Sequence, residues 1–108
     1  MHLHELSAIP TKEYVPGFHG KMIHTAQMTL AYWQIEAGAS LPEHAHHHEQ
    51  VVNVLKGEFE LIVDGISHHL KAGMVYVLPG GTPHAGHATT DCELLDVFQP
   101  VREDYRDL

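Results

Sequence analysis

Histidine is the chemically versatile residue that this sequence has in excess. Twelve of the 108 residues are histidines, and four of them, His44, His46, His47 and His48, lie within five positions. The cluster lies in the middle of the chain and is interrupted by Ala45, which is not the pattern of a terminal purification tag. Because imidazole nitrogens are common ligands of divalent metals, the cluster predicts a metal site.

The spacing of His44 and His46 suits chelation on a β-strand. Alternate residues of a strand face the same way, with Cα atoms about 6.6 Å apart, so two imidazoles can converge on one ion. On a helix the same pair would point to nearly opposite sides. Gln50 has the same parity, and its amide oxygen is a candidate third ligand. His84 follows Pro83 in a loop after a strand and could close the site from across a barrel.

Most of the other histidines are expected to be ordinary surface or core residues. His68 and His69 are adjacent, so on a strand they face opposite sides of the sheet and cannot bind one ion together. His47 is out of parity with its neighbours, and His87 is also expected to be an ordinary residue rather than a ligand. His48 shares the parity of the candidate ligands, so it stays open as an alternative ligand or as a group that supports one.

The elements that must position these residues are predicted to be short strands. No long segment repeats apolar residues every three to four positions, and Gly and Pro recur at short intervals. The expected strands span residues 28–35, 50–55, 58–63, 66–70, 74–78 and 92–99. Asp64-Gly65 is a strong hairpin signal, because Gly accepts the positive φ of a type I′ turn. This pattern predicts an all-β sandwich or barrel, with a short helical turn in the tail 101–108. Residues 1–20 give no clear pattern.

The last expected strand carries a second candidate group. Asp96 and Phe98 share one face with Leu94, so Asp96 is expected to point into a mostly apolar interior. Burial raises the pKa of a carboxyl, which suits it to general acid–base work. Arg102 follows the bend at Pro100 and could curl back over the barrel mouth to hold a carboxylate. The spacing leaves an alternative equally open, in which Asp96 caps a turn and Arg102 is solvated.

Two blocks of fixed spacing resemble the paired signature of the cupin superfamily. They consist of Gly38, His44, His46, Gln50 and Gly57, and then Gly73, Pro79, Gly81 and His84, with fifteen residues between the blocks. The resemblance implies a double-stranded β-helix, or jelly-roll, barrel. It also implies a divalent transition metal held by His44, His46, Gln50 and His84. Two positions depart from the family pattern, since Gln50 stands where Glu is usual and Ala88 where Asn is usual.

The exchange of Glu for Gln50 changes the expected chemistry. Three neutral imidazoles and a neutral amide leave the ion's +2 charge uncompensated, which makes it a stronger Lewis acid. The set also departs from the two-histidine, one-carboxylate pattern of non-haem iron oxygenases. We therefore expect the ion to polarise a substrate oxygen rather than to activate dioxygen. The ligands leave Zn, Ni, Fe, Mn and Cu open.

A narrower resemblance covers two segments. Residues 94–105 resemble the ending of small cupins that linearise unsaturated uronates, and residues 44–50 are similar to their metal motif, including Gln at the ligand position. Those cupins act after pectate or alginate lyases and convert the cyclic 4,5-unsaturated monouronate into its open-chain keto form. The resemblance implies that Asp96 and Arg102 are catalytic and that Phe98 and Arg102 contact the substrate.

Two other functional classes stay open for this sequence. One is a cupin that binds a metal or a sugar without catalysis, as in the sensing modules of regulators. The other is an oxygen-dependent cupin dioxygenase, against which the neutral Gln50 argues.

Composition narrows the partners. Six Lys and Arg against fourteen Asp and Glu give a net charge of −8, which argues against a nucleic-acid partner. The resemblance to uronate-linearising cupins implies that the partner is a small anionic sugar acid. The longest apolar run, residues 74–78, is too short for a membrane span of about 20 residues. The same run is too apolar for a strand with one wet face, so we expect a homodimer. The lone Cys92 and the absence of a signal sequence lead us to expect one cytoplasmic domain over residues 1–108.

Overall fold

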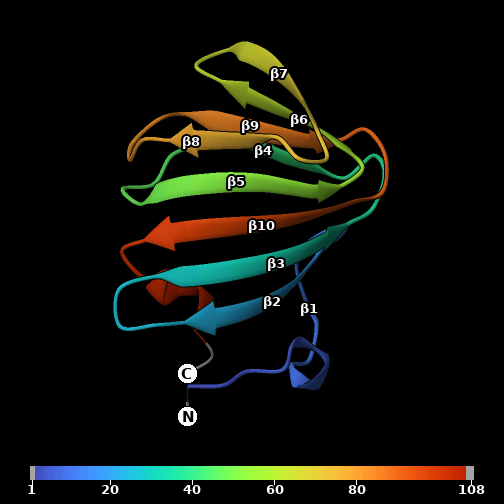
Figure 1. The fold of residues 1–108 in the computed structure, drawn as a ribbon. Helices are drawn as coiled ribbons and strands as arrows, with labels where there is room; N and C mark the ends of the chain where they lie inside the picture. The colour runs from blue at the N-terminus through green and yellow to red at the C-terminus, as the bar shows by residue number, and fades with distance from the viewer. Residues whose placement is uncertain (1, 107–108) are drawn as a thin grey trace.

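Two antiparallel β-sheets make up the fold in the computed structural model, which describes residues 2–106 (Figure 1). The larger sheet has the strand order β1 (Lys12–Val15), β2 (Phe18–His24), β3 (Thr29–Ile35), β10 (Cys92–Gln99), β5 (Glu49–Lys56), β8 (Val75–Leu78). The smaller sheet has the order β4 (Ser40–His44), β9 (His84–Ala88), β6 (Glu58–Val63), β7 (Ile66–Lys71). Two short 3-10 helices, η1 (Leu6–Ala8) and η2 (Glu103–Tyr105), lie near the ends of the chain. The predicted all-β jelly-roll barrel is confirmed.

The six expected strands are present, each with ends within one residue of the prediction. The β6–β7 hairpin turns at Asp64 and Gly65, whose φ angles of 49° and 78° are both positive, as a type I′ turn requires. The strands that lie outside these six predicted ranges are β1, β2, β4 and β9. The expected helical turn in the tail is η2, and residues 107–108 lie outside the described part of the chain.

Strand β10 is a central strand of the larger sheet and is paired on its two sides with β3 and β5. Its burial alternates, so Cys92, Leu94, Asp96 and Phe98 all point inward. The same face of β5 and β3 supplies further buried side chains, and the smaller sheet closes the interior with residues such as Phe59. An acidic side chain in the middle of β10 is therefore held inside the barrel.

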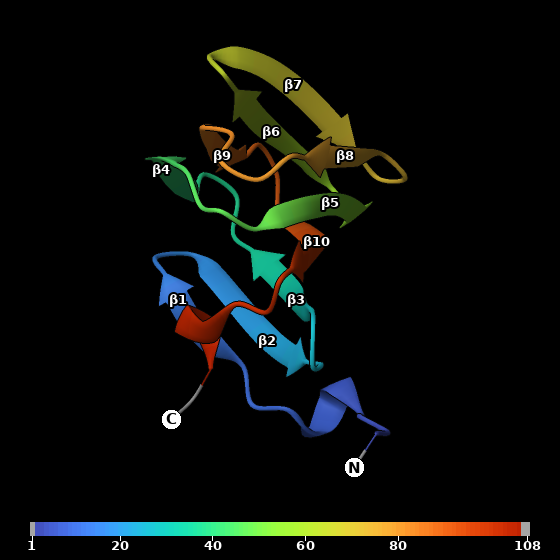
Figure 2. The same ribbon diagram turned by 90° about the vertical axis from the view of Figure 1, so that its left-hand side faces the viewer.

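The chain crosses between the sheets several times, as Figure 2 illustrates for β4, β5 and β9. Strand β8 is an edge of the larger sheet. Helix η2 packs against β1, where the rings of Tyr14 and Tyr105 meet with centroids 5.2 Å apart. Across residues 2–106, the chain has no helix of the length and apolarity that crossing a membrane requires.

Candidate metal centre

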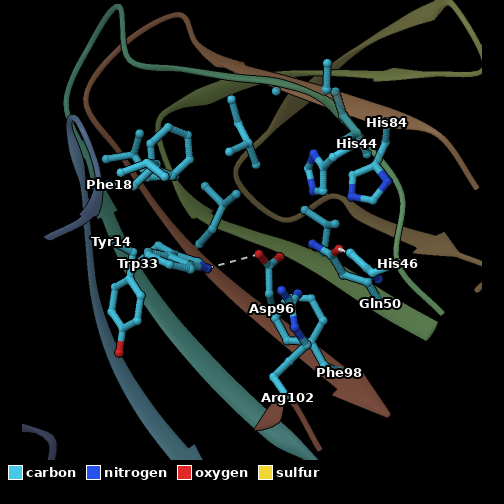
Figure 3. A pocket seen from close by; sticks show the side chains of 18 of the residues that line it. Tyr14, Phe18, Trp33, His44, His46, Gln50, His84, Asp96, Phe98 and Arg102 are labelled. Carbon is cyan, nitrogen blue, oxygen red and sulfur yellow. Dashed lines mark hydrogen bonds between the residues drawn. The ribbon is translucent and has the colours of Figure 1, made fainter. Parts of the chain in front are cut away.

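Three of the four predicted ligands are histidines that converge inside the barrel. His44 is the last residue of β4 and His84 the first residue of β9, and the two are direct cross-strand partners. His46 lies in the loop between β4 and β5. The ligating nitrogens of the three imidazoles all lie within 4.8 Å of one another, and Figure 3 shows the rings gathered at one side of the pocket. We call these three residues the histidine triad.

The route by which His46 reaches the site differs from the prediction. Strand β4 ends at His44, so the alternation of strand side chains does not place His46 beside it. The loop itself does so, because Gly81 N–H donates to His46 O at 2.7 Å and ties the two motif segments together. Gly80 lies so close to His47 O that a Cβ atom at this position would collide with that oxygen. The placement of His84 in a loop is likewise wrong, since it begins β9.

Backbone carbonyls orient all three rings of the triad. Each Nδ1 lies near a carbonyl oxygen: His44 near Pro42 O at 2.9 Å, His46 near His48 O at 3.2 Å, and His84 near Thr82 O at 2.8 Å. A carbonyl can only accept a hydrogen bond, so Nδ1 carries the proton in each neutral ring. The lone pair of each ring is then on Nε2, which is the arrangement that metal-binding histidines use.

Two details of the triad fit a bound cation. His84 Nε2 is buried and has no hydrogen-bond partner within the described structure. His46 Nε2 lies 3.1 Å from Gln50 Oε1 while its Nδ1 already faces a carbonyl, so one neutral ring meets two acceptors with one N–H. A cation shared by Nε2 and Oε1 satisfies both atoms. Three imidazole nitrogens and an amide oxygen are a donor set that suits a divalent transition metal.

The protonation of the triad also fits metal binding. Burial, together with the nearby charges of Arg102 and His84, lowers the pKa of His46 to about 4. Burial lowers the pKa of His84 as well. Because a protonated imidazole cannot ligate a metal, neutral rings at neutral pH leave these Nε2 lone pairs available.

Asp96 points into the same interior, so the alternative that it caps a turn is wrong. Its side chain is 7% exposed, and Oδ2 accepts a hydrogen bond from Trp33 Nε1 at 3.1 Å, as the dashed line in Figure 3 marks. Its other oxygen, Oδ1, is buried and lacks a hydrogen-bond partner in residues 2–106. Burial raises the pKa of this carboxyl to about 7, against the opposing effects of Gln50, Trp33 and Arg102.

Arg102 is 8% exposed, so it is not a solvated tail residue. Its backbone N–H donates to Thr29 Oγ1 at 2.9 Å, which returns the chain to the barrel after Pro100. Its guanidinium lies over the ring of Phe98, 4.7 Å from the centroid. The predicted return of Arg102 to the barrel mouth is therefore observed.

These groups line one cavity of about 290 Å³. Its lining includes the polar side chains of the triad, Gln50, Asp96 and Arg102, together with apolar side chains such as Phe18, Trp33 and Phe59. Trp33 and Tyr105 also line the cavity and were not predicted from the sequence as part of the site. The signal for Trp33 was its parity with Ala31 and Ile35 on a predicted strand, which places its side chain inside.

The other histidines stay outside the triad. His48 is buried and lends its carbonyl to His46, so it supports a candidate ligand rather than replacing one. His68 packs on Tyr76, and His69 pairs with Glu58 at 2.9 Å. A second group of possible ligands, Glu13, His19 and Glu36, lies at the surface, where His19 Nε2 already pairs with Glu36 at 2.7 Å.

Comparisons with solved structures agree with this fold. An RmlC-like cupin from Shewanella frigidimarina is 29% identical, with a TM-score of 0.93 over 98% of this chain and 96% of that one. The structure of KdgF from Halomonas sp. is also 29% identical, with a TM-score of 0.85 over 90% of this chain and 91% of that one.

The curated relatives are longer proteins. The HTH-type transcriptional regulator PuuR of Escherichia coli is 26% identical over 92 residues, which cover 79% of this chain and 50% of the regulator. This chain thus spans about half the length of that relative. The cupin-domain family itself matches residues 31–98, the segment that carries the triad, Gln50, Asp96 and Phe98. A match over more than half of the sequence, on a jelly roll with both motif segments in place, makes this chain a member of the cupin family.

Proposed function

We propose that this cupin is a metal-dependent isomerase that converts cyclic 4,5-unsaturated monouronates into their linear keto form. The observation that carries the proposal is that the triad, Gln50, Asp96 and Arg102 all line one cavity. The likeness to KdgF supports it, because KdgF is a cupin that acts on unsaturated uronates.

The proposed metal ligands are His44, His46, Gln50 and His84. Cupins commonly bind divalent metals. A metal ion here is favoured by His84 Nε2, which is buried without a hydrogen-bond partner in the described residues, and by His46 Nε2, which faces the amide oxygen of Gln50. When bound, a divalent transition metal would supply Lewis acidity that polarises a substrate oxygen. Because all four ligands are neutral, none of them offsets the charge of the ion.

The proposed reaction moves one proton and breaks one ring bond without changing the formula of the substrate. The anomeric hydroxyl loses its proton, the bond between carbon 1 and the ring oxygen breaks, and an aldehyde forms at carbon 1. The ring oxygen stays on carbon 5 as an enolate oxygen, and protonation of carbon 4 turns that enolate into a ketone. One proton leaves an oxygen and one arrives at a carbon, so a single acid–base group can serve both steps.

Asp96 is the proposed acid–base group. Its Oδ1 is buried without a partner while Oδ2 is held by Trp33, so Oδ1 is the atom able to hold or release a proton. Its pKa of about 7 lets both forms exist near neutral pH. Arg102 is proposed to bind the substrate carboxylate, with Phe98 fixing the plane of its guanidinium.

The direct test is turnover of a monouronate made by a pectate lyase. We expect the metal-loaded protein to abolish the absorbance of the conjugated enol-ether acid, with a linear keto product. Boiled protein and buffer provide the background. Unchanged absorbance across lyase-made galacturonate-, mannuronate- and guluronate-derived substrates would refute the proposed activity.

A sugar-binding or metal-binding module without catalysis is the second candidate, because PuuR, a transcriptional regulator, shares 26% identity over 79% of this chain. That function predicts saturable binding of a small ligand with no change in the ligand after prolonged incubation. A dioxygenase predicts oxygen uptake on addition of Fe(II) and a phenolic or thiol substrate. We expect no uptake, since Gln50 provides no carboxylate ligand.

A further inference from the structure

We propose that Asp104 is a positioning residue, which aims the guanidinium of Arg102 into the cavity so that its free edge can hold a substrate carboxylate. The proposal deepens the function proposed above and rests on it. Asp104 lies in η2, outside the segment 31–98 that the cupin family matches.

The first support is the way in which the two side chains meet. Arg102 Nε donates to Asp104 Oδ1 at 2.9 Å and Arg102 Nη2 donates to Oδ2 at 2.7 Å. This side-on pair uses two of the five N–H groups of a guanidinium. Of the remaining three, one N–H on Nη1 and one on Nη2 form the end-on edge, which matches a second carboxylate. Asp104 thus fixes the arginine without using the edge that a substrate needs.

The second support is the restraint on the plane of the guanidinium. The guanidinium carbon of Arg102 lies 4.7 Å from the ring centroid of Phe98 and 4.1 Å from that of Tyr105. Contacts of this kind combine cation–π attraction with packing. The backbone of Arg102 is held by Thr29, and one edge of its guanidinium is held by Asp104. The two rings therefore restrict the remaining rotation of the guanidinium plane about its contact with Asp104.

The third support is the direction of the pair. The side chain of Asp104 is 57% exposed, whereas that of Arg102 is 9% exposed. Both residues line the cavity, and the carboxylate of Asp104 is the member of the pair that is more open to solvent. Arg102 lines the same cavity as the histidine triad. A substrate carboxylate held by the end-on edge of Arg102 would therefore lie in the cavity that the triad also lines.

An opposite role for Asp104 makes opposite predictions. If Asp104 only competes with the substrate for Arg102, its removal frees a cation and tightens anion binding. If Asp104 positions Arg102, its removal weakens binding and slows turnover, although a negative charge has been deleted. Glu103 is the matched control, because it lies in the same turn and pairs with Arg106 at 3.1 Å instead of with Arg102.

The experiment compares Asp104→Ala, Asp104→Asn and Glu103→Ala with the wild type. Two readouts are used: kcat and KM on the lyase-made unsaturated galacturonate, and calorimetric binding of D-galacturonate, which needs no turnover. We expect Asp104→Ala to lower kcat/KM about tenfold or more, mostly through kcat, and to weaken galacturonate binding several-fold. Asp104→Asn keeps one acceptor oxygen and should lie between the alanine variant and the wild type. Glu103→Ala should match the wild type.

The Arg102→Ala background shows whether Asp104 acts through Arg102. We expect Asp104→Ala to change neither readout further there, because a residue that only positions another loses its effect with it. A further loss of kcat/KM or galacturonate affinity in that background would overturn the proposal. Galacturonate binding by Asp104→Ala that is unchanged or tighter than that of the wild type would also overturn it. So would equal effects of Asp104→Ala and Asp104→Asn. If the wild type binds galacturonate but does not turn over the unsaturated substrate, the isomerase activity is refuted. The galacturonate affinities of the Asp104 variants then still test whether Asp104 positions Arg102. A wild type that neither binds nor turns over would overturn both.

Discussion

At the scale of single residues, the site depends on which atoms are left without partners. The carbonyls of Pro42, His48 and Thr82 occupy the Nδ1 atoms of the triad, so each Nε2 is left for a ligand. Trp33 occupies one oxygen of Asp96 in the same way and leaves Oδ1 facing the interior. Buried polar atoms without partners cost about 1–3 kcal/mol each, so their persistence together in one cavity indicates a ligand that satisfies them.

Gln50→Glu tests the importance of a neutral ligand set. The new carboxylate would offset part of the metal charge and stand beside the Asp96 carboxyl, so turnover should fall by about tenfold or more while bound metal is retained. The measurement is kcat together with metal content by elemental analysis. A fully active variant would show that the neutral amide has no role in the chemistry.

Asp96→Asn tests the proposed acid–base group. The amide keeps the shape of the side chain and cannot exchange a proton at neutral pH, so kcat should fall by about 10² to 10⁴-fold with little change in galacturonate binding. Steady-state kinetics and calorimetry on the same preparation provide both numbers. Wild-type turnover in this variant would remove Asp96 from the mechanism.

At the scale of elements, the parts that the sequence predicted are those with local signals. Strands β6 and β7 were predicted because alternating side chains flank a turn whose Asp64-Gly65 pair requires positive φ. Strand β9 was missed, because the sequence His-Ala-Gly-His-Ala lacks the residues that favour strands. Pairing with β4 and β6, both distant in sequence, creates it. Gly86 suits that place, since a Cβ there would lie 2.5 Å from Phe59 Cζ.

The same distinction holds for the site. The four candidate ligands followed from spacing, because fixed separations in sequence reflect fixed loops between strands. The orientation of Asp96 followed from its parity with Leu94 and Phe98 on a strand. The contact between Trp33 and Asp96 could not be predicted, because it depends on the register between β3 and β10, which are far apart in sequence.

Trp33→Phe tests whether β3 positions the carboxyl of β10. The substitution keeps a large aromatic ring and removes the Nε1–H that Asp96 Oδ2 accepts. We expect kcat to fall about tenfold while KM changes little, since the substrate carboxylate is held elsewhere. Thermal unfolding monitored by circular dichroism reports the integrity of the fold. An unchanged kcat would mean that the indole only fills space.

At the scale of the whole molecule, an acidic protein is proposed to bind an acidic substrate. The net charge is −8, yet Arg102 is a buried cation at the cavity, and the proposed metal would add to it. Charges at short range in a site shielded from solvent outweigh distant surface charges, which salt screens within about 8–10 Å. The overall charge therefore does not oppose the proposed substrate.

The exposed edge of the larger sheet leads us to propose a homodimer. Strand β8 ends that sheet, and Val75 and Val77 are each 56% exposed on it. An apolar edge strand is usually covered, and a second copy of the chain would cover it by pairing edge to edge. Val75→Lys with Val77→Lys should convert the dimer to a monomer in analytical ultracentrifugation. A wild type that is monomeric at high protein concentration would contradict this assembly.

Metal analysis of one pair of variants tests the central claim most directly. His84 and His87 both belong to β9, but His84 is a member of the triad, whereas His87 forms a hydrogen bond with Ser40. We predict about one divalent transition metal ion per chain in the wild type and in His87→Ala, and loss of that ion with loss of turnover in His84→Ala. A full complement of metal in His84→Ala, or wild-type protein that takes up no transition metal, would contradict the account.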